Sequence, residues 1–336
     1  MIKIKMLSMA DKVDGQGVGS AYLEQIGLVN KSKKLEIVKK KPDIIHHHTI
    51  NPNYYLKMKL SKCPNVAYVH FLPHTLDESI KLPKPIFNIY KKYVISLYKN
   101  ADYLVVVNPI FIEDLKKYNI AEEKIVYIPN YVSKDKFYKK TNKEKTKIRE
   151  KYNISPSKFV VVGAGQVQTR KGVKDFVECA KKLPNIEFVW CGGFSFGKIT
   201  DGYEELKQLM ENPPSNVKFL GIIPREEMND IYNMADLFFL PSYNELFPMT
   251  ILETVNTEVP ILLRDLDLYK VILFDNYFKG NNNDEFINII EELSKNPEMQ
   301  KKGIQNSKNI SNFYSKEHVL EMWEDFYQKV YDEVKD

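Results

Sequence analysis

The chain is most constrained by short apolar runs that recur between longer helical stretches. The runs NVAYVHF, DYLVVVN and KFVVVGAGQV are rich in β-branched residues and apolar on both faces. Strands of this kind fit a parallel sheet that helices cover on both sides. Their alternation with helical stretches predicts a doubly wound α/β fold.

The length of 336 residues suits two such domains better than one. Segment 128–155 is dense in charge and poor in core residues, so it is the predicted connection between them. We place the N-terminal domain at 1–140, the C-terminal domain at 141–312 and a terminal helix at 313–336. Two Rossmann-like domains with a cleft between them are the expected architecture.

Charge is divided unevenly along the chain, although the net charge is only +5. Residues 1–150 carry 28 Lys and Arg against 15 Asp and Glu, whereas residues 151–336 carry 21 against 29. The N-terminal half is therefore expected to face a polyanion, either nucleic acid or an anionic membrane surface. No uncharged apolar run approaches the roughly 20 residues needed to cross a bilayer. The three cysteines form no CxxC pair, which favours a reduced cytosolic protein without a zinc site.

The segment PSYNELFPMTILETVNTEVPI carries the most specific motif, in which Glu245 and Glu253 stand eight residues apart. A helix that begins near Pro248 would present free backbone N–H groups, which suit a diphosphate. Glu245, before the helix, can accept hydrogen bonds from sugar hydroxyls, and Glu253 can reach a second diol such as a ribose. The motif therefore favours a site for a sugar, a diphosphate and a ribose.

This motif resembles the two-glutamate signature of the family 4 retaining glycosyltransferases, which have the GT-B fold. Both glutamates and Pro260 match the family pattern. Three positions depart from it, because Leu246, Thr254 and Glu258 replace the usual Gly, Ala and Gly.

The resemblance implies a role for each residue of the motif. Glu245 would hold the donor hexose as a catalytic residue, and Glu253 would bind the ribose. The backbone of Phe247, Pro248 and Met249 would cap the leaving diphosphate. No metal and no cofactor are implied, because a UDP-sugar enters as the donor substrate.

A second match is VGAGQVQTRKGV, which resembles the family's Gly-Arg-x(4)-Lys-Gly turn. Lys171 falls on the lysine that holds the donor diphosphate, as a point charge suited to phosphate. Gln166 falls where the family usually has arginine, and Arg170 is the candidate to replace that donor contact.

Two further matches lie in the N-terminal half. The loop DGQGVGS, which contains Gly17, lets the backbone approach a bound phosphate or sugar closely. His70 ends a strand and aligns with the family's histidine near the donor hexose, so it is a candidate catalytic residue. Neighbouring strand residues point to opposite faces, so the consecutive His46, His47 and His48 cannot converge on one metal ion.

Stretch 82–100 predicts a cationic amphipathic helix that begins near Pro85. Ile86 and Ile89 belong to its apolar face, and lysines gather on the other side. Such a helix fits shallow insertion into an anionic bilayer, although a core helix with a solvated lysine face is the commoner case. The residues assigned to membrane docking are Lys84, Tyr90, Lys91, Lys92, Tyr93 and Lys99.

The segments GQGVGSAYLEQ, HTINPNYYL and YVHFLPHTL resemble bacterial enzymes that add a second hexose to monoglucosyl-diacylglycerol. The resemblance implies a membrane-associated retaining glycosyltransferase that uses a UDP-hexose, with UDP-glucose first and UDP-galactose second. It also implies a cytoplasmic protein on the inner face of the cell membrane, with the glycolipid acceptor and an anionic membrane surface as partners. Neither the linkage formed nor an oligomeric state follows from the sequence.

Three other functions compete with this one. A transferase for a soluble glycan or a capsule unit would use the same chemistry. A UDP-sugar epimerase shares the GT-B fold and would release a modified free sugar without any acceptor. A nucleic-acid module is disfavoured, because the basic half lacks the interleaved aromatic and basic residues of a stacking platform.

Overall fold

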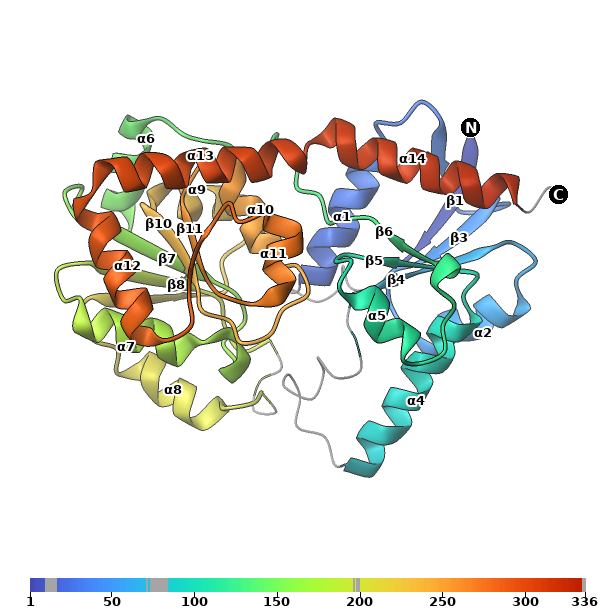
Figure 1. The fold of residues 1–336 in the computed structure, drawn as a ribbon, viewed down its shortest axis with the longest axis horizontal. Helices are drawn as coiled ribbons and strands as arrows, with labels where there is room; N and C mark the ends of the chain where they lie inside the picture. The colour runs from blue at the N-terminus through green and yellow to red at the C-terminus, as the bar shows by residue number, and fades with distance from the viewer. Residues whose placement is uncertain (10–16, 71, 73–83, 196, 198–199, 334–336) are drawn as a thin grey trace. The chain divides into compact units, whose positions relative to one another are not determined.

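The computed structural model describes residues 1–9, 17–70, 72, 84–195, 197 and 200–333 (Figure 1). The chain forms two compact units, of which the first holds the described residues up to 133 and those from 314 onward. The second unit holds the described residues of 134–313, so the predicted boundary at residue 140 falls inside it. Phe137 is buried in this unit, and the backbone N–H of Lys140 donates to Asn233 at 2.7 Å.

The first unit is built on a six-stranded sheet with the order β2-β1-β3-β4-β5-β6. All of its strand pairs are parallel, as predicted. The strands are β1 (Ile2–Leu7), β2 (Leu35–Ile37), β3 (Ile44–His47), β4 (Asn65–Val69), β5 (Tyr103–Val106) and β6 (Ile125–Tyr127). Its helices are α1 (Gly17–Val29), α2 (Pro52–Leu60), α4 (Lys84–Asn100), α5 (Phe111–Lys116), the short 3₁₀ helix η2 (Glu122–Lys124) and α14 (Lys316–Asp332).

The second unit repeats this plan with the parallel order β12-β11-β10-β7-β8-β9. Its strands are β7 (Val160–Ala164), β8 (Glu187–Cys191), β9 (Val217–Gly221), β10 (Leu237–Leu240), β11 (Ile261–Arg264) and β12 (Phe278–Gly280). Its helices are α6 (Asn142–Lys151), η3 (Thr169–Lys171), α7 (Val173–Lys182), α8 (Tyr203–Glu211), η5 (Arg225–Glu227), α9 (Met228–Met234), α10 (Met249–Asn256), α11 (Asp267–Leu273), α12 (Asn283–Lys295) and α13 (Pro297–Phe313). Helices α7 and α12 pack together on one face of the sheet, and α9, α10 and α13 cover the other (Figure 1). The predicted two Rossmann-like α/β domains are therefore confirmed.

In each sheet, the direction in which the chain adds successive strands reverses at one point. In the second unit the chain runs outward from β7 through β8 to β9, and then returns to place β10 on the other side of β7. Ligands of open α/β sheets bind beyond the carboxyl ends of the strands at such a switch point. The loops that follow β7 and β10 are therefore the expected binding loops of this unit.

The last helix of the chain, α14, belongs to the first unit. It contacts α1, β1 and β3 and buries Trp323, Phe326 and Tyr327. The Tyr327 hydroxyl lies 2.6 Å from Nδ1 of His46 and 3.1 Å from the side-chain amide of Gln25. A polar network and an aromatic core therefore anchor the end of the chain to the first sheet.

Two glycines allow loops at the carboxyl ends of the second sheet's strands to pack against each other. Gly192 has φ +139, and a Cβ there would lie 1.8 Å from the carbonyl oxygen of Gly165. Gly172 has φ +70, and a Cβ there would lie 2.3 Å from the carbonyl oxygen of Pro241. Both contacts are with backbone, so the neighbour cannot move aside cheaply.

We expect Gly192→Ala to destabilise the second unit by about 2–4 kcal/mol, because it adds a backbone clash to a strained φ. Urea unfolding measures the loss. The matched control is Gly27→Ala in α1, where no atom beyond the neighbouring residues and the helix's own backbone lies within 4 Å of the added Cβ. The control should be neutral or stabilising by up to about 1 kcal/mol. Equal stability of Gly192→Ala and the wild type would contradict the close approach.

Candidate functional site

The switch point of the second sheet brings together residues from distant parts of the sequence. Gln166 follows β7, and Arg170 and Lys171 belong to the short helix η3 after it. Glu245 lies in the loop between β10 and α10. The backbone N–H of Tyr243 donates to the carbonyl of Arg170 at 2.7 Å, which joins the two loops.

Glu245 is a buried carboxylate that faces two cations. The Nζ of Lys171 donates to it directly, and Nη1 of Arg170 lies 3.7 Å away. Burial alone would raise the pKa of Glu245, but Lys171 and Arg170 outweigh it and hold that pKa below its ordinary value. Burial lowers the pKa of Lys171, and the Glu245 carboxylate opposes this effect. One carboxylate against two cations leaves a positive excess, which suits an anionic ligand.

Hydrogen bonds between successive side chains orient Arg170. The amide of Gln168 donates to Oε1 of Gln166 at 2.7 Å, and Nε of Arg170 donates to Oε1 of Gln168 at 3.0 Å. Nη1 of Arg170 also donates to the carbonyl of Asn244 at 3.0 Å. Gln166 thus reaches the cation pair through Gln168, while the guanidinium keeps further N–H groups for a ligand.

Glu253 is held by partners from another helix pair. It lies in α10 and is 5% exposed. The Tyr232 hydroxyl of α9 donates to it at 2.7 Å, and Nη2 of Arg225 lies 3.2 Å from Oε1. These contacts fix the Glu253 carboxylate in the helix that follows the Glu245 loop.

The segment between the two glutamates starts α10. Phe247 and Met249 are buried, and Pro248 occupies the N-cap position without a side-chain cap bond. The first turn of a helix leaves its backbone N–H groups without intrahelical partners. Oγ1 of Thr250 in this turn is buried and has no hydrogen-bond partner among the described residues. The helix start predicted near Pro248 is confirmed, and the Thr250 hydroxyl and the first N–H groups of α10 suit phosphate oxygens.

Three of these site residues were not predicted from the sequence. Gln168 lies at an unspecified position of the segment VGAGQVQTRKGV, and Arg225 and Tyr232 lie in no motif. Arg225 and Tyr232 act on a residue more than twenty positions away, and this pairing exists only in the folded sheet.

In the first unit, His70 follows the carboxyl end of β4 and stacks on Tyr68 with ring centroids 4.2 Å apart. Its Nε2 lies 3.4 Å from Nδ1 of His48. His46 stacks on His48 at 4.5 Å, whereas His47 points to the other face and contacts Asn65 at 3.0 Å. The histidines are therefore divided between two faces, as predicted. Gly17 is the first residue of α1, after the part of its loop that lies outside the described residues.

Helix α4 begins at Lys84, which confirms the predicted helix. Lys84, Lys92 and Lys99 are exposed, whereas Tyr90 and Lys91 are half-buried. Tyr93 is also half-buried, and its hydroxyl donates to the carbonyl of Ile50. The basic face is therefore open, and Tyr93 contributes to packing.

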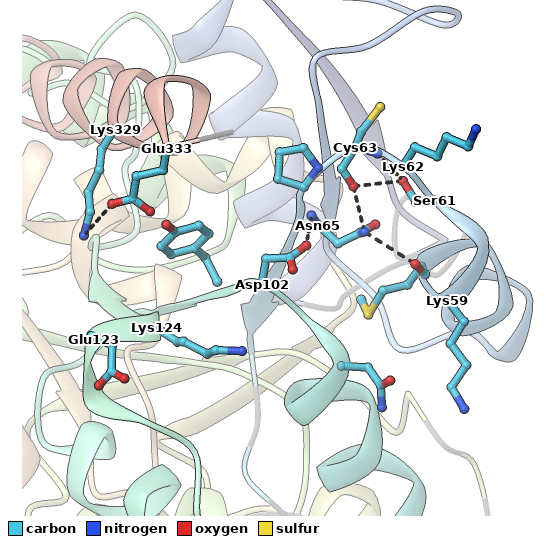
Figure 2. Close-up of a pocket in the computed structure, with 14 residues that line it drawn as sticks. Lys59, Ser61, Lys62, Cys63, Asn65, Asp102, Glu123, Lys124, Lys329 and Glu333 are labelled. Atoms are coloured by element: carbon cyan, nitrogen blue, oxygen red, sulfur yellow. Dashed lines mark hydrogen bonds and ion pairs between the residues drawn. The ribbon is translucent and has the colours of Figure 1, made fainter. Parts of the chain in front are cut away.

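A pocket of about 720 Å³ opens in the first unit beside the starts of β4 and β5 (Figure 2). Its lining mixes both charges, and an Asp102 carboxylate accepts from the backbone N–H of Asn65 at 2.7 Å. The charged residues that line it are Lys59, Lys62, Asp102, Glu123, Lys124, Lys329 and Glu333. The predicted site residues follow the carboxyl ends of the strands, whereas this pocket lies at their amino ends, on the opposite edge of the sheet.

Within the described ranges, no group of three or more His, Cys, Asp or Glu residues is arranged to hold a metal ion. The helices in the part of the chain that the structure describes are also too short or too polar to cross a bilayer.

Comparison with known proteins identifies the chain. Residues 22–136 match the model of Glycosyltransferase Family 4, and residues 144–310 match that of Glycosyl transferases group 1. The chain is 49% identical to the alpha-galactosylglucosyldiacylglycerol synthase of Streptococcus pneumoniae, over 98% of this chain and 90% of the relative. It is 26% identical to the processive diacylglycerol alpha-glucosyltransferase of Acholeplasma laidlawii, over 94% of both chains.

Solved structures agree on the fold. The Anabaena protein HepE, in complex with UDP and glucose, superposes with a TM-score of 0.76 over the full length of both chains, at 16% identity. The chain therefore belongs to the family 4 glycosyltransferases and has the GT-B fold. It is an enzyme that transfers a sugar.

The buried histidines predict an acid-sensitive first unit. Burial, and the repulsion of nearby histidines, lower the pKa values of His46 and His48 well below 6.5. The folded chain keeps them neutral while the unfolded chain takes up protons. Stability should therefore fall as the pH drops below about 6.5, by up to about 1.4 kcal/mol per pH unit for each histidine.

Urea unfolding at pH 7.5 and pH 5.5 measures this loss. The fluorescence of Trp323, whose ring lies 5.5 Å from His46, follows the unfolding of the first unit. The Trp190→Phe substitution removes the other tryptophan of the chain. His46→Gln/His48→Gln should lose part of the pH dependence, and His47 and His70, whose pKa values burial also lowers, should keep the rest. If the protein that retains His46 and His48 is equally stable at both pH values, the prediction is contradicted.

Proposed function

We propose that the protein transfers a hexose from a UDP-sugar to monoglucosyl-diacylglycerol and so makes a diglycosyl-diacylglycerol. The observation that carries the proposal is the 49% identity to the streptococcal synthase across nearly the whole chain. The name of that relative favours galactose as the transferred hexose, whereas the sequence alone put glucose first.

The donor is held by the second unit. Lys171 and Arg170 bind the diphosphate, because their positive excess surrounds Glu245 in the loop that leads into α10, whose first N–H groups also suit phosphate. Gln166 contributes through Gln168, which orients Arg170. Glu253 binds the ribose, and the backbone of Phe247–Met249 caps the phosphates.

Glu245 orients the hexose and remains ionised, since Lys171 and Arg170 lower its pKa. The same cations stabilise the charge that develops on the leaving diphosphate. Transfer with retention then proceeds by attack from the face of the leaving group, whose phosphate oxygen accepts the proton of the acceptor hydroxyl. The protein supplies orientation and charge stabilisation, and no protein nucleophile is required.

The acceptor is presented by the first unit. Gly17 and His70 follow β1 and β4 at the carboxyl edge. Burial lowers the pKa of His70 to about 3, so the ring is neutral where it stacks on Tyr68. Docking on an anionic membrane through α4 brings the glycolipid within reach, since Lys84, Lys92 and Lys99 are exposed. We place the enzyme at the cytoplasmic face of the cell membrane.

The test is a product analysis. Vesicles that contain monoglucosyl-diacylglycerol are incubated with the enzyme and either UDP-galactose or UDP-glucose, and the lipid is identified by mass spectrometry. We expect a diglycosyl-diacylglycerol with galactose, and loss of at least about 100-fold in rate for Glu245→Gln.

Other products would contradict the proposal. Transfer to free sugars that is independent of lipid would indicate a soluble-glycan transferase. A modified free sugar formed without an acceptor would indicate an epimerase. A Glu245→Gln variant as fast as the wild type would exclude the proposed site.

A further inference from the structure

Helix α2 exposes two leucines that the fold of the first unit does not use. Leu56 is 58% exposed and Leu60 is 83% exposed. They stand one helical turn apart and therefore share one face. The opposite face points inward, because Met58 is buried and the Tyr54 hydroxyl donates to the carbonyl of Ser8 at 2.9 Å. The leucines form an apolar ridge directed away from the sheet.

Lysines flank this ridge on both sides. A helix turns about 100° per residue, which places Lys57 on one side of the ridge and Lys59 on the other. Both lysines are exposed. The Nζ of Lys57 lies 5.7 Å from the ring centroid of Tyr54, and the Nζ of Lys59 lies 4.7 Å from that of Tyr55. An apolar ridge between cations is the arrangement of a helix at a bilayer interface, where lysine stems bury and their ammonium groups reach the headgroups.

Helix α2 packs directly against α4. The Tyr55 hydroxyl lies 2.7 Å from Oγ of Ser96, and the Tyr55 ring meets that of Tyr93 edge to face at 5.7 Å. Ile89 precedes Tyr93 by four residues and Ser96 by seven, so it lies on the face of α4 that meets α2. Ile89 is 70% exposed, and Ile86 is 54% exposed three residues before it.

The two packed helices therefore both expose apolar residues, those of α4 near its start and those of α2 near its end. We call Leu56, Leu60, Ile86 and Ile89 the α2–α4 surface. The sequences of α2 and α4 contain six lysines and no Asp or Glu. This charge favours an anionic occupant, and the apolar residues favour one with a hydrocarbon interior.

We propose that α2 is a second membrane-docking element, whose Leu56–Leu60 ridge enters the interface of an anionic bilayer beside α4. This inference rests on the proposed docking of α4 and extends it to a surface of two helices. Two elements fix the orientation of the first unit on the membrane, whereas one helix would leave it free to rotate about its axis.

The test is binding to sedimented vesicles of phosphatidylglycerol and phosphatidylcholine. Leu56→Ser/Leu60→Ser should bind about tenfold more weakly than the wild type, because the serine side chains remove less apolar surface from water on docking. The matched control is Val271→Ser, at a position of the second unit that is 44% exposed. It should bind like the wild type. Both variants should unfold at the wild-type urea concentration, which separates docking from folding.

A charge variant tests the flanking lysines. Lys57→Gln/Lys59→Gln should weaken binding to the anionic vesicles and reduce its dependence on salt. Lys143→Gln/Lys147→Gln, at exposed positions of the second unit, changes the net charge equally and should have little effect.

Ile86→Ser/Ile89→Ser separates this inference from the proposal on which it rests. If this variant loses binding while Leu56→Ser/Leu60→Ser keeps it, α4 docks alone and the inference is overturned. If both variants bind like the wild type, or if the wild type does not bind the vesicles, docking through α4 fails as well.

Discussion

The contact of Glu245 with Lys171 and Arg170 is the interaction on which the proposed donor site depends. Lys171 is buried and Arg170 is half-buried, so the two cations repel each other and lose hydration, and the carboxylate between them stabilises both. One carboxylate neutralises only one of them. The pair is therefore stable in the folded chain and still attracts an anion. In the proposed site, a diphosphate would supply the missing charge beside the N–H groups of the first turn of α10.

The topology of the second sheet makes this contact form. Strands β7 and β10 are far apart in sequence but adjacent in the sheet, so the loops after them meet at the switch point. Gly172 lets these loops approach, because any side chain there would strike the carbonyl of Pro241. Glu253 is then placed by its position in α10 and held by Arg225 and Tyr232.

Much of this arrangement could be predicted from sequence, because it depends on local pattern. Apolar runs predicted the parallel strands, and Pro248 marked the start of α10. Contacts formed between distant segments could not be predicted in this way. Segment 128–155 reads as a polar connection, yet Phe137 is buried against Tyr232 of α9. The ridge of α2 is too short to give a periodic signal, and its exposure depends on which face Met58 turns inward.

The central claim is that the Lys171–Arg170 pair recognises the diphosphate of the donor. Calorimetric titration of the enzyme with UDP and with uridine tests it directly, because the two ligands differ only in the diphosphate. We expect UDP to bind at least about 100-fold more tightly than uridine. Lys171→Met should remove most of this difference and leave uridine binding unchanged. Equal affinity for UDP and uridine in the wild type would contradict the account.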